Sequence, residues 1–144
     1  MLVLYNRETF ICSSRAYNSA VSDERVLAPR RLGTQMIIEQ MSIAVPHGKK
    51  QQLGSALASF VGPTRVRPGC LNCSLVQSWT DPDELRFESR WENEDDLIRH
   101  LKSDSYKQLL QLMELSSTPP QIEFFEVVKA QGLDLVCSVR STPI

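Results

Sequence analysis

The sequence predicts an α+β domain in which four strands and two helices follow one another in the order βαββαβ. Two alternating runs and two runs rich in apolar residues mark the four strands, and two stretches with apolar residues every three or four positions mark the helices. Gly, Pro and Asp clusters separate these runs. This order is the ferredoxin-like plan, an antiparallel four-stranded sheet with both helical connections on one face.

The first strand is expected over Gln35 to Val45, with mostly apolar residues on both faces around the carboxylate of Glu39. A strand with two apolar faces is normally covered on both sides. A helix should follow from about Lys49 to Val61, ended by Gly62 and Pro63.

Cys70 to Trp79 and Glu84 to Trp91 should form a hairpin, because both runs alternate and the residues between them favour a turn. Asn93 can then cap a helix whose first turn is acidic. His100 lies at the border of the inward stripe of that helix. It follows Asp96 by one turn, so the carboxylate can reach the imidazole.

The second half of the plan is completed by a helix over about Tyr106 to Leu115 and a strand over Ile122 to Val128. Leu133, Leu135, Cys137 and Val139 alternate and predict a strand-like tail. The expected organisation is a poorly ordered extension over residues 1–33, a domain over 34–129 and the tail over 130–144.

Helices on one face leave the other face of the sheet bare, although its strands read as apolar. A second copy of the chain is the simplest cover for such a face. We therefore expect a homodimer whose two sheets face each other.

The composition narrows the functional classes. Sixteen basic and 17 acidic residues give no field that would attract nucleic acid or anionic lipid. No apolar run approaches the length of a membrane span, and the interrupted apolar start argues against a signal peptide. Four cysteines without a secretion signal are expected to be thiols, Cys12, Cys70, Cys73 and Cys137. We expect a cytoplasmic protein.

Three sequence motifs occur in a recognisable order: V-R-P-G-C-L before the second strand, D-P in the hairpin, and F-E-S-R-W-E-N-E-D-D-L-I-R-H-L-K-S-D-S-Y from Phe87 to Tyr106. Together with the order of elements, they resemble the antibiotic biosynthesis monooxygenase family, the dimeric α/β-barrel group that includes small quinol monooxygenases. The resemblance covers roughly Gln35 to Val128. Some family members oxygenate phenols or quinols without metal or flavin, some degrade haem, and others have no established activity, so the fold does not decide the reaction.

Two departures from relatives affect the expected chemistry. Haem-degrading relatives use an Asn, a Trp and a His where this chain has Gln40, His100 and about Leu110, so we expect no specific haem complex. Relatives often carry Glu two residues before the strand-end Trp. Here Ser89 occupies that position, and Glu88 points to the other face.

Cofactor-free oxygenation requires a dry, aromatic-lined pocket and one base. The resemblance implies a small aromatic or quinone-like substrate and O2, with neither cofactor nor metal. His100 is the candidate base, oriented by Asp96. Trp91, Asn72, Gln40 and Tyr106 are the candidate substrate-binding residues. Each also has a purely structural alternative, His100 as a space-filling core residue and the aromatic rings as core packing.

Two further alternatives concern the activity and the cysteines. The chain could be a non-catalytic dimeric module that binds a small apolar molecule or serves as an accessory protein. Cys70 and Cys73 form a C-x-x-C, but residues three apart in a regular strand face opposite sides, so we expect neither a redox pair nor a metal site.

Overall fold

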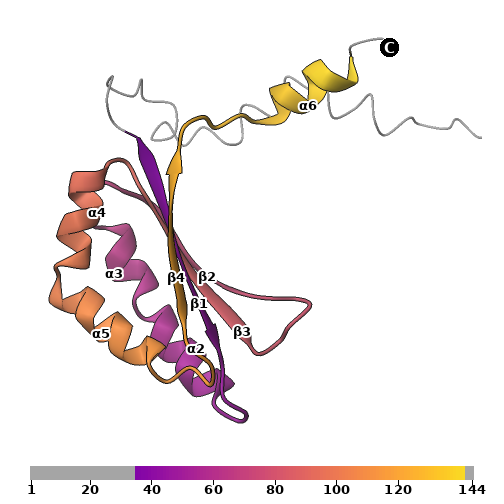
Figure 1. Cartoon of the computed structure of the whole chain (residues 1–144). Coiled ribbons are helices and arrows are strands. Elements are labelled where there is room, and N and C mark those ends of the chain that lie inside the picture. Colours follow the sequence, from indigo (N-terminus) through magenta and orange to yellow (C-terminus); the bar gives the residue numbers. More distant parts are fainter. Residues whose placement is uncertain (1–34, 142–144) are drawn as a thin grey trace, which may run out of the picture. The chain divides into compact units, whose positions relative to one another are not determined.

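The computed structural model describes residues 35–141, within which the predicted order of strands and helices is present (Figure 1). The expected poorly ordered extension over residues 1–33 lies outside the described residues. In chain order the elements are β1 (Met36–Ala44), α2 (Lys50–Ala58), α3 (Val61–Arg65), β2 (Cys70–Gln77), β3 (Glu84–Trp91), α4 (Glu94–Leu101), α5 (Asp104–Met113), β4 (Gln121–Val127) and α6 (Leu133–Arg140).

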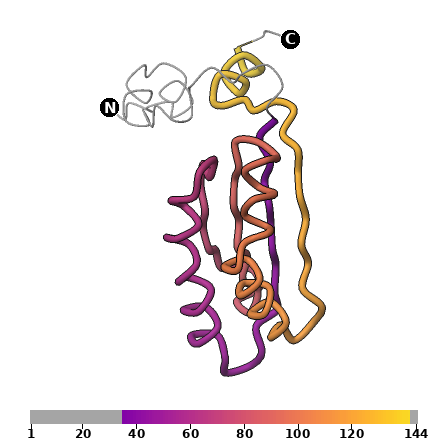
Figure 2. The backbone as a smooth tube through the Cα atoms, turned by 90° about the vertical axis from the view of Figure 1, so that its left-hand side faces the viewer, coloured from indigo at the N-terminus to yellow at the C-terminus, as the bar shows by residue number. Residues whose placement is uncertain are grey.

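The four strands form one antiparallel sheet in the order β2-β3-β1-β4, which confirms the ferredoxin-like plan. The helices α2, α3, α4 and α5 all lie on one face of the sheet (Figure 1). Viewed from the helix side, α2 and α3 lie beside α4 and α5, and β4 runs along the edge beyond them (Figure 2). The side chains of β4 are accordingly exposed along almost its whole length.

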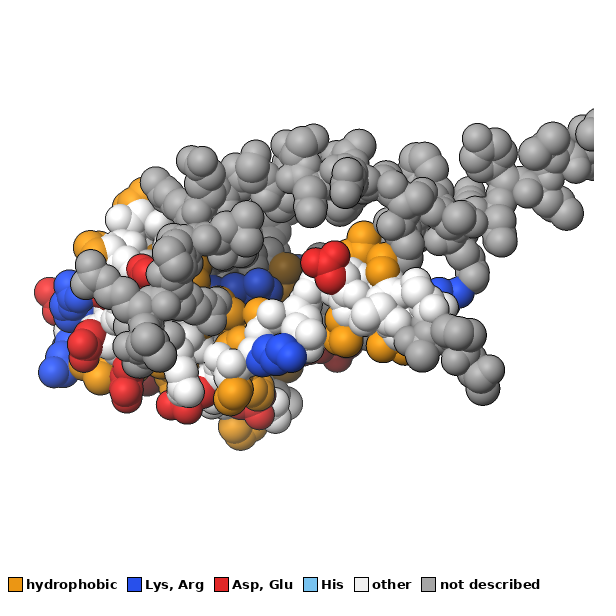
Figure 3. Space-filling view, turned by 90° about the horizontal axis from the view of Figure 1, so that it is seen from above, with side chains coloured by type: hydrophobic (Ala, Val, Ile, Leu, Met, Phe, Trp, Pro, Cys, Tyr) orange, Lys and Arg blue, Asp and Glu red, His pale blue; other side chains and the backbone are white. Residues whose placement is uncertain are grey.

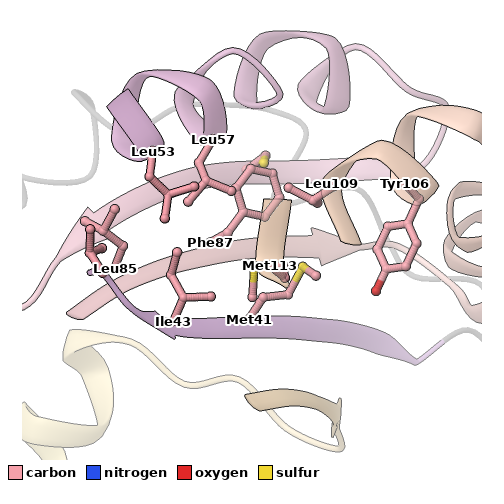
Figure 4. Packing of buried hydrophobic residues seen from close by; sticks show 11 residues of the cluster. Met41, Ile43, Leu53, Leu57, Leu85, Phe87, Tyr106, Leu109 and Met113 are labelled. Carbon is pink, nitrogen blue, oxygen red and sulfur yellow. The ribbon is translucent and has the colours of Figure 1, made fainter. Parts of the chain in front are cut away.

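The core lies between the helices and the inner face of the sheet. Alternate residues of β1 and β3 are buried, as the period of two predicts. Met41 and Phe87 from the sheet meet Leu57 from α2 and Leu109 and Met113 from α5 (Figure 4). A smaller cluster of Ile37, Trp91 and Leu97 lies at the α4 end.

Helices α4 and α5 both begin with a side-chain cap, and the cap at Asn93 was predicted. The Asn93 side chain accepts a hydrogen bond from the Asp96 amide at 2.9 Å, and Ser103 accepts one from the Tyr106 amide at 3.2 Å. Such caps satisfy N–H groups that have no partner within the helix. They fix where α4 and α5 begin and therefore which of their residues face the sheet.

The first helical connection differs from the prediction. Helix α2 ends at Ala58, and Gly62 and Pro63, expected to stop a helix, lie inside the short helix α3. Pro63 is tolerated there because it occupies the first turn, where a backbone N–H would have no helical partner.

The second strand contains a β-bulge that the sequence did not indicate. Cys70 is opposite Trp91 and Cys73 is opposite Ser89, while the register shifts between Cys70 and Asn72. The extra residue places Cys70 and Cys73 on the same, inner face of the sheet, so the expectation that their side chains diverge is wrong.

The helix-free face of the sheet is more polar than predicted. Along β3, Arg86 pairs with Glu84 at 3.2 Å and Arg90 pairs with Glu88 at 3.0 Å. Apolar residues on this face gather at one end of β1 and β4, where Met36 is opposite Val127 and Ile38 is opposite Phe125, whereas Gln40 is opposite Glu123 further along. The prediction of an apolar face is therefore wrong for β3 and for the rest of β1 and β4.

Residues 129–141 form a separate compact unit from residues 35–128. The predicted strand-like tail is a helix, α6, so that prediction is wrong. Its apolar residues also fit helical spacing, and periodicity alone does not separate the two for so short a run. None of the helices within residues 35–141 combines the length and the apolar character that a membrane span requires.

Candidate functional site

His100 lies on the inner side of α4 with only 2% of its surface exposed. Its imidazole stacks on the indole of Trp91, with 4.7 Å between ring centroids and 25° between ring planes. The ring of Tyr106 meets the same imidazole edge-on at 5.1 Å and 76°. Strand β3 and helices α4 and α5 thus bring three of the predicted site residues together.

Neither ring nitrogen of His100 has a hydrogen-bond partner within the described part of the chain. Buried polar atoms are nearly always paired, so this histidine is an exception that requires a reason. Burial, with a smaller contribution from the positive charge of Arg67, lowers the pKa of His100 to about 4. The imidazole is therefore neutral at pH 7 and offers one N–H donor and one acceptor.

A buried carboxylate, Glu39, lies at the centre of the hydrogen bonds beside these rings. The Tyr106 hydroxyl donates to Glu39 Oε1 at 2.6 Å, and the Ser89 hydroxyl donates to Glu39 Oε2 at 2.7 Å. Trp91 Nε1 in turn donates to Ser89 Oγ at 2.8 Å. All four of these side chains are buried, and Glu39 is completely inaccessible to solvent.

Burial is the main cause that raises the pKa of Glu39, although the hydrogen bonds from Tyr106 and Ser89 act in the opposite direction. Burial, together with the adjacent Glu39, also raises the pKa of Tyr106. Tyr106 therefore remains a phenol and serves as a donor to the carboxylate.

Sequence reasoning noted Glu39 as a polar residue on an apolar strand face but did not place it in the site. Its hydrogen-bond partners are 50 and 67 residues away along the chain. The sequence feature that could have placed Glu39 in the site is a carboxyl group on an otherwise apolar strand, because such a group needs hydrogen-bond donors when it is buried. The resemblance implies a Glu at the position of Ser89, which this chain lacks. Glu39 on β1 is directly opposite Ser89 and places a carboxyl group on the same face of the sheet.

The predicted pairing of Asp96 with His100 is wrong. Asp96 accepts a hydrogen bond from Asn93 Nδ2 at 2.8 Å and forms an ion pair with Arg99. Its carboxylate also lies against the backbone of Gly69. These contacts turn Asp96 toward the helix start and away from the imidazole.

Asn72 and Gln40 are on the opposite face of the sheet from His100. Gln40 donates to Glu88 Oε2 at 3.0 Å on the helix-free face, and Asn72 is opposite Arg90 on that face and exposed. They therefore do not line a pocket with Trp91 and Tyr106 in this chain. The reason is strand alternation, because Gln40 lies next to the inward-facing Glu39 and Asn72 lies next to the inward-facing Cys73.

A sequence model described as "Antibiotic biosynthesis monooxygenase" matches residues 36–112, more than half of the chain. The chain belongs to the antibiotic biosynthesis monooxygenase family. The matched range includes every residue of the hydrogen-bonded cluster around Glu39 and the whole of α4.

Several solved structures have the same fold. A putative antibiotic biosynthesis monooxygenase from Deinococcus radiodurans is 18% identical, with a TM-score of 0.62 over 67% of this chain and 96% of that one. Protein SO0527 from Shewanella oneidensis is 23% identical, with a TM-score of 0.61 over 67% and 95% of the two chains. By sequence alone, the chain is also similar to the uncharacterized protein sll1783 from Synechocystis, which is 24% identical over 98 residues, 67% of either chain.

Other chemical groups of this family member lie apart from the imidazole or are unreactive. Cys70 and Cys73 are free, whereas Cys137 is disulfide-bonded, so the expectation of four thiols is wrong for Cys137. Burial raises the pKa of Cys73 to about 12, which keeps it a thiol. Among the described residues, no three His, Cys, Asp or Glu side chains come together in a group that could hold a metal ion.

A separate apolar cavity of about 390 Å³ lies between α2 and the end of α5. None of the predicted site residues lines it. Its lining consists of two polar residues, Lys49 and Gln52, and of apolar residues, Pro46, Leu53, Ala56, Leu112 and Leu115. The volume is within the range of small-molecule pockets.

Charged side chains of both signs share the face of the domain at the α4 end. At the end of the domain where α4 lies, acidic and basic side chains stand side by side (Figure 3). Interspersed charges of both signs produce no strong field at long range.

Proposed function

We propose that this family member is a cofactor-independent monooxygenase that oxidises a quinol or another phenolic compound with O2. The observation that carries the proposal is the buried imidazole of His100, whose ring nitrogens have no partner in residues 35–141 while two aromatic rings flank it. A neutral imidazole in this setting can accept a hydrogen bond from the hydroxyl group of a phenol.

The proposed reaction starts with proton transfer from the hydroxyl group to His100. A histidine with a pKa of about 4 is a weak base, but a phenol becomes far more acidic as it loses an electron. Proton transfer to His100 accompanied by electron transfer to O2 is therefore the consistent first step. Recombination of the organic radical with reduced oxygen forms a C–O bond, and loss of water gives the quinone. Overall, one hydroquinone and one O2 yield one hydroxyquinone and one water.

Trp91 and Tyr106 would supply the walls of the pocket in this proposal. Their apolar rings would keep water away from the imidazole and from the reacting oxygen. The proposed reaction assigns no role to Asp96, Asn72 or Gln40. Asp96 is hydrogen-bonded to Asn93, and Gln40 and Asn72 lie on the helix-free face of the sheet.

Oxygen uptake with a panel of substituted hydroquinones tests the proposal. The wild type should consume O2 faster than the uncatalysed autoxidation, and His100→Ala should reduce kcat by about 100-fold or more, the usual contribution of a general base. His47→Ala is the matched control, since His47 lies in an exposed loop. An unchanged rate in His100→Ala removes His100 from the mechanism.

The apolar cavity between α2 and α5 supports a second candidate, a non-catalytic module that binds a small apolar molecule. In that case no hydroquinone would accelerate O2 uptake. The substitution Leu112→Trp would fill the cavity and abolish binding of an apolar ligand. The two candidates therefore differ both in turnover and in the residue that controls binding.

We also propose a homodimer. The supporting observations are the apolar residues on the helix-free face and along the edge strand, where Phe125 is 45% exposed and directly opposite Ile38. A second copy that covers them would remove this apolar surface from water.

A further inference from the structure

We propose that Glu39 is the positioning residue of the His100 site, one buried carboxylate that holds in place both aromatic rings flanking the imidazole. The inference deepens the proposed function and rests on it where turnover is concerned. The geometric part of the inference concerns Glu39, Ser89, Trp91 and Tyr106 and can be measured without substrate.

The two carboxylate oxygens hold the two rings by separate paths. Oε1 accepts from the Tyr106 hydroxyl at 2.6 Å, and Tyr106 meets the imidazole edge-on. Oε2 accepts from Ser89 at 2.7 Å, and Ser89 accepts from the indole of Trp91, which stacks on the imidazole. One side chain on β1 therefore determines how both rings stand relative to His100 on α4.

The stability of the fold does not explain why a carboxylate occupies this position. Glu39 is inaccessible to solvent, and none of the ion pairs among the described residues includes it. Removing a carboxylate from water without a cation is costly, and apolar replacements of buried charges are often neutral or stabilising. A function in arranging the site accounts for the presence of a carboxyl group here, where folding does not.

The substitution Glu39→Gln isolates this function because it keeps the shape and removes only one acceptor. An amide offers one oxygen and one NH2 group, so only one of the two donors, Tyr106 or Ser89, retains an acceptor. The other hydroxyl must accept from the NH2 group and turn its own proton elsewhere, which rearranges the hydrogen bonds on its path to the ring. Glu92→Gln is the matched control, since its side chain is exposed.

The indole N–H signals in a ¹H–¹⁵N spectrum report this directly, because the chain has two tryptophans. Trp91 is buried with its N–H bonded to Ser89, whereas Trp79 is 98% exposed and serves as an internal reference. Trp79→Phe assigns the signals. We expect Glu39→Gln to move the Trp91 signal and to raise its hydrogen-exchange rate about tenfold or more, with no change at Trp79. Glu92→Gln should leave both signals in place.

A swap across the strand pair provides the positive test. Glu39 and Ser89 are directly opposite on β1 and β3, so E39S/S89E keeps the composition and moves the carboxylate by one strand. We expect the swap to restore slow exchange at Trp91 and most of the hydroquinone turnover that Glu39→Gln loses. Tyr106→Phe should leave the Trp91 signal near its wild-type position, since it belongs to the other path.

Unchanged Trp91 signals in both Glu39→Gln and Glu39→Leu, which removes both acceptors, or a swap that restores neither exchange protection nor turnover, would overturn the inference. Failure of the proposed function has a different signature, because the wild type would then show no hydroquinone-dependent O2 uptake while the indole signals still respond to Glu39→Gln.

Discussion

His100 and Trp91 form a stacked pair with 4.7 Å between ring centroids, although eight residues, including the turn from β3 into α4, lie between them in the chain. The Asn93 cap sets the start of α4 so that His100 faces inward. The imidazole is buried without a hydrogen-bond partner among the described residues, so its protonation should affect the stability of the fold as well as the activity.

The first prediction concerns pH. The pKa of His100 is lowered from 6.5 to about 4 in the folded state. Between these values the unfolded chain binds a proton that the folded chain does not, so stability should fall as the pH falls, by on the order of 2 kcal/mol at pH 5. Glu39 offsets part of this loss, since its raised pKa lets the folded state bind a proton.

Urea unfolding of the wild type and His100→Leu at pH 7, 6 and 5 measures this effect. The wild type should lose more stability over this range than His100→Leu, which has no imidazole to protonate. Equal pH dependence of the two proteins would show that His100 is not buried as a neutral side chain.

The second prediction concerns Gly69, which precedes β2. Its φ is +79°, and a Cβ placed there would overlap the carboxylate of Asp96. Gly69→Ala should therefore destabilise the fold by roughly 2–4 kcal/mol, measured by urea unfolding.

Two other glycines provide graded controls. Gly48 also has a positive φ, +76°, but open space around it, so Gly48→Ala should cost only about 1 kcal/mol. Gly62 lies in α3 with nothing nearby, so Gly62→Ala should be neutral or slightly stabilising. A different order of the three values would contradict the described Gly69–Asp96 contact.

The third prediction compares the two tryptophans. Trp91→Phe removes a buried ring and the donor to Ser89, which should cost roughly 1–3 kcal/mol. Trp79→Phe changes an exposed side chain and should remain within about 0.5 kcal/mol of the wild type. Chemical unfolding of both variants measures this, and similar losses would argue against the buried position of Trp91.

The fourth prediction concerns the homodimer, and sedimentation velocity measures it. The wild type should sediment as a dimer, and Phe125→Lys should shift it toward the monomer by placing a charge on the helix-free face. Val66→Lys, at an exposed loop position, should not. A monomeric wild type would remove this proposal.

Local patterns were sufficient to predict the fold. The alternation in β1 and β3, the Asn93 and Ser103 caps and the turn between β2 and β3 are each encoded within a few residues. The family resemblance was carried by the same stretch from Phe87 to Tyr106, and the match over residues 36–112 confirmed it.

The parts that were predicted wrongly depend on contacts between distant segments. The bulge in β2 has no local marker, and it places Cys70 and Asn72, which would share a face in a regular strand, on opposite faces. Asp96 is one turn from His100 along α4, yet its carboxylate is hydrogen-bonded to Asn93 and paired with Arg99. Glu39 joined the site only because β1 pairs with β3 and α5 covers both, which no single segment indicates.

The most direct measurement of the central claim is the ¹⁵N spectrum of the histidine rings during titration with 4-chlorophenol at pH 7. The chain has two histidines, and His47→Ala assigns them. If His100 accepts the hydrogen bond of a phenol, one of its ring nitrogens should shift with saturation while His47 does not. A His100 signal that stays fixed while the phenol binds elsewhere, or does not bind, would contradict the account.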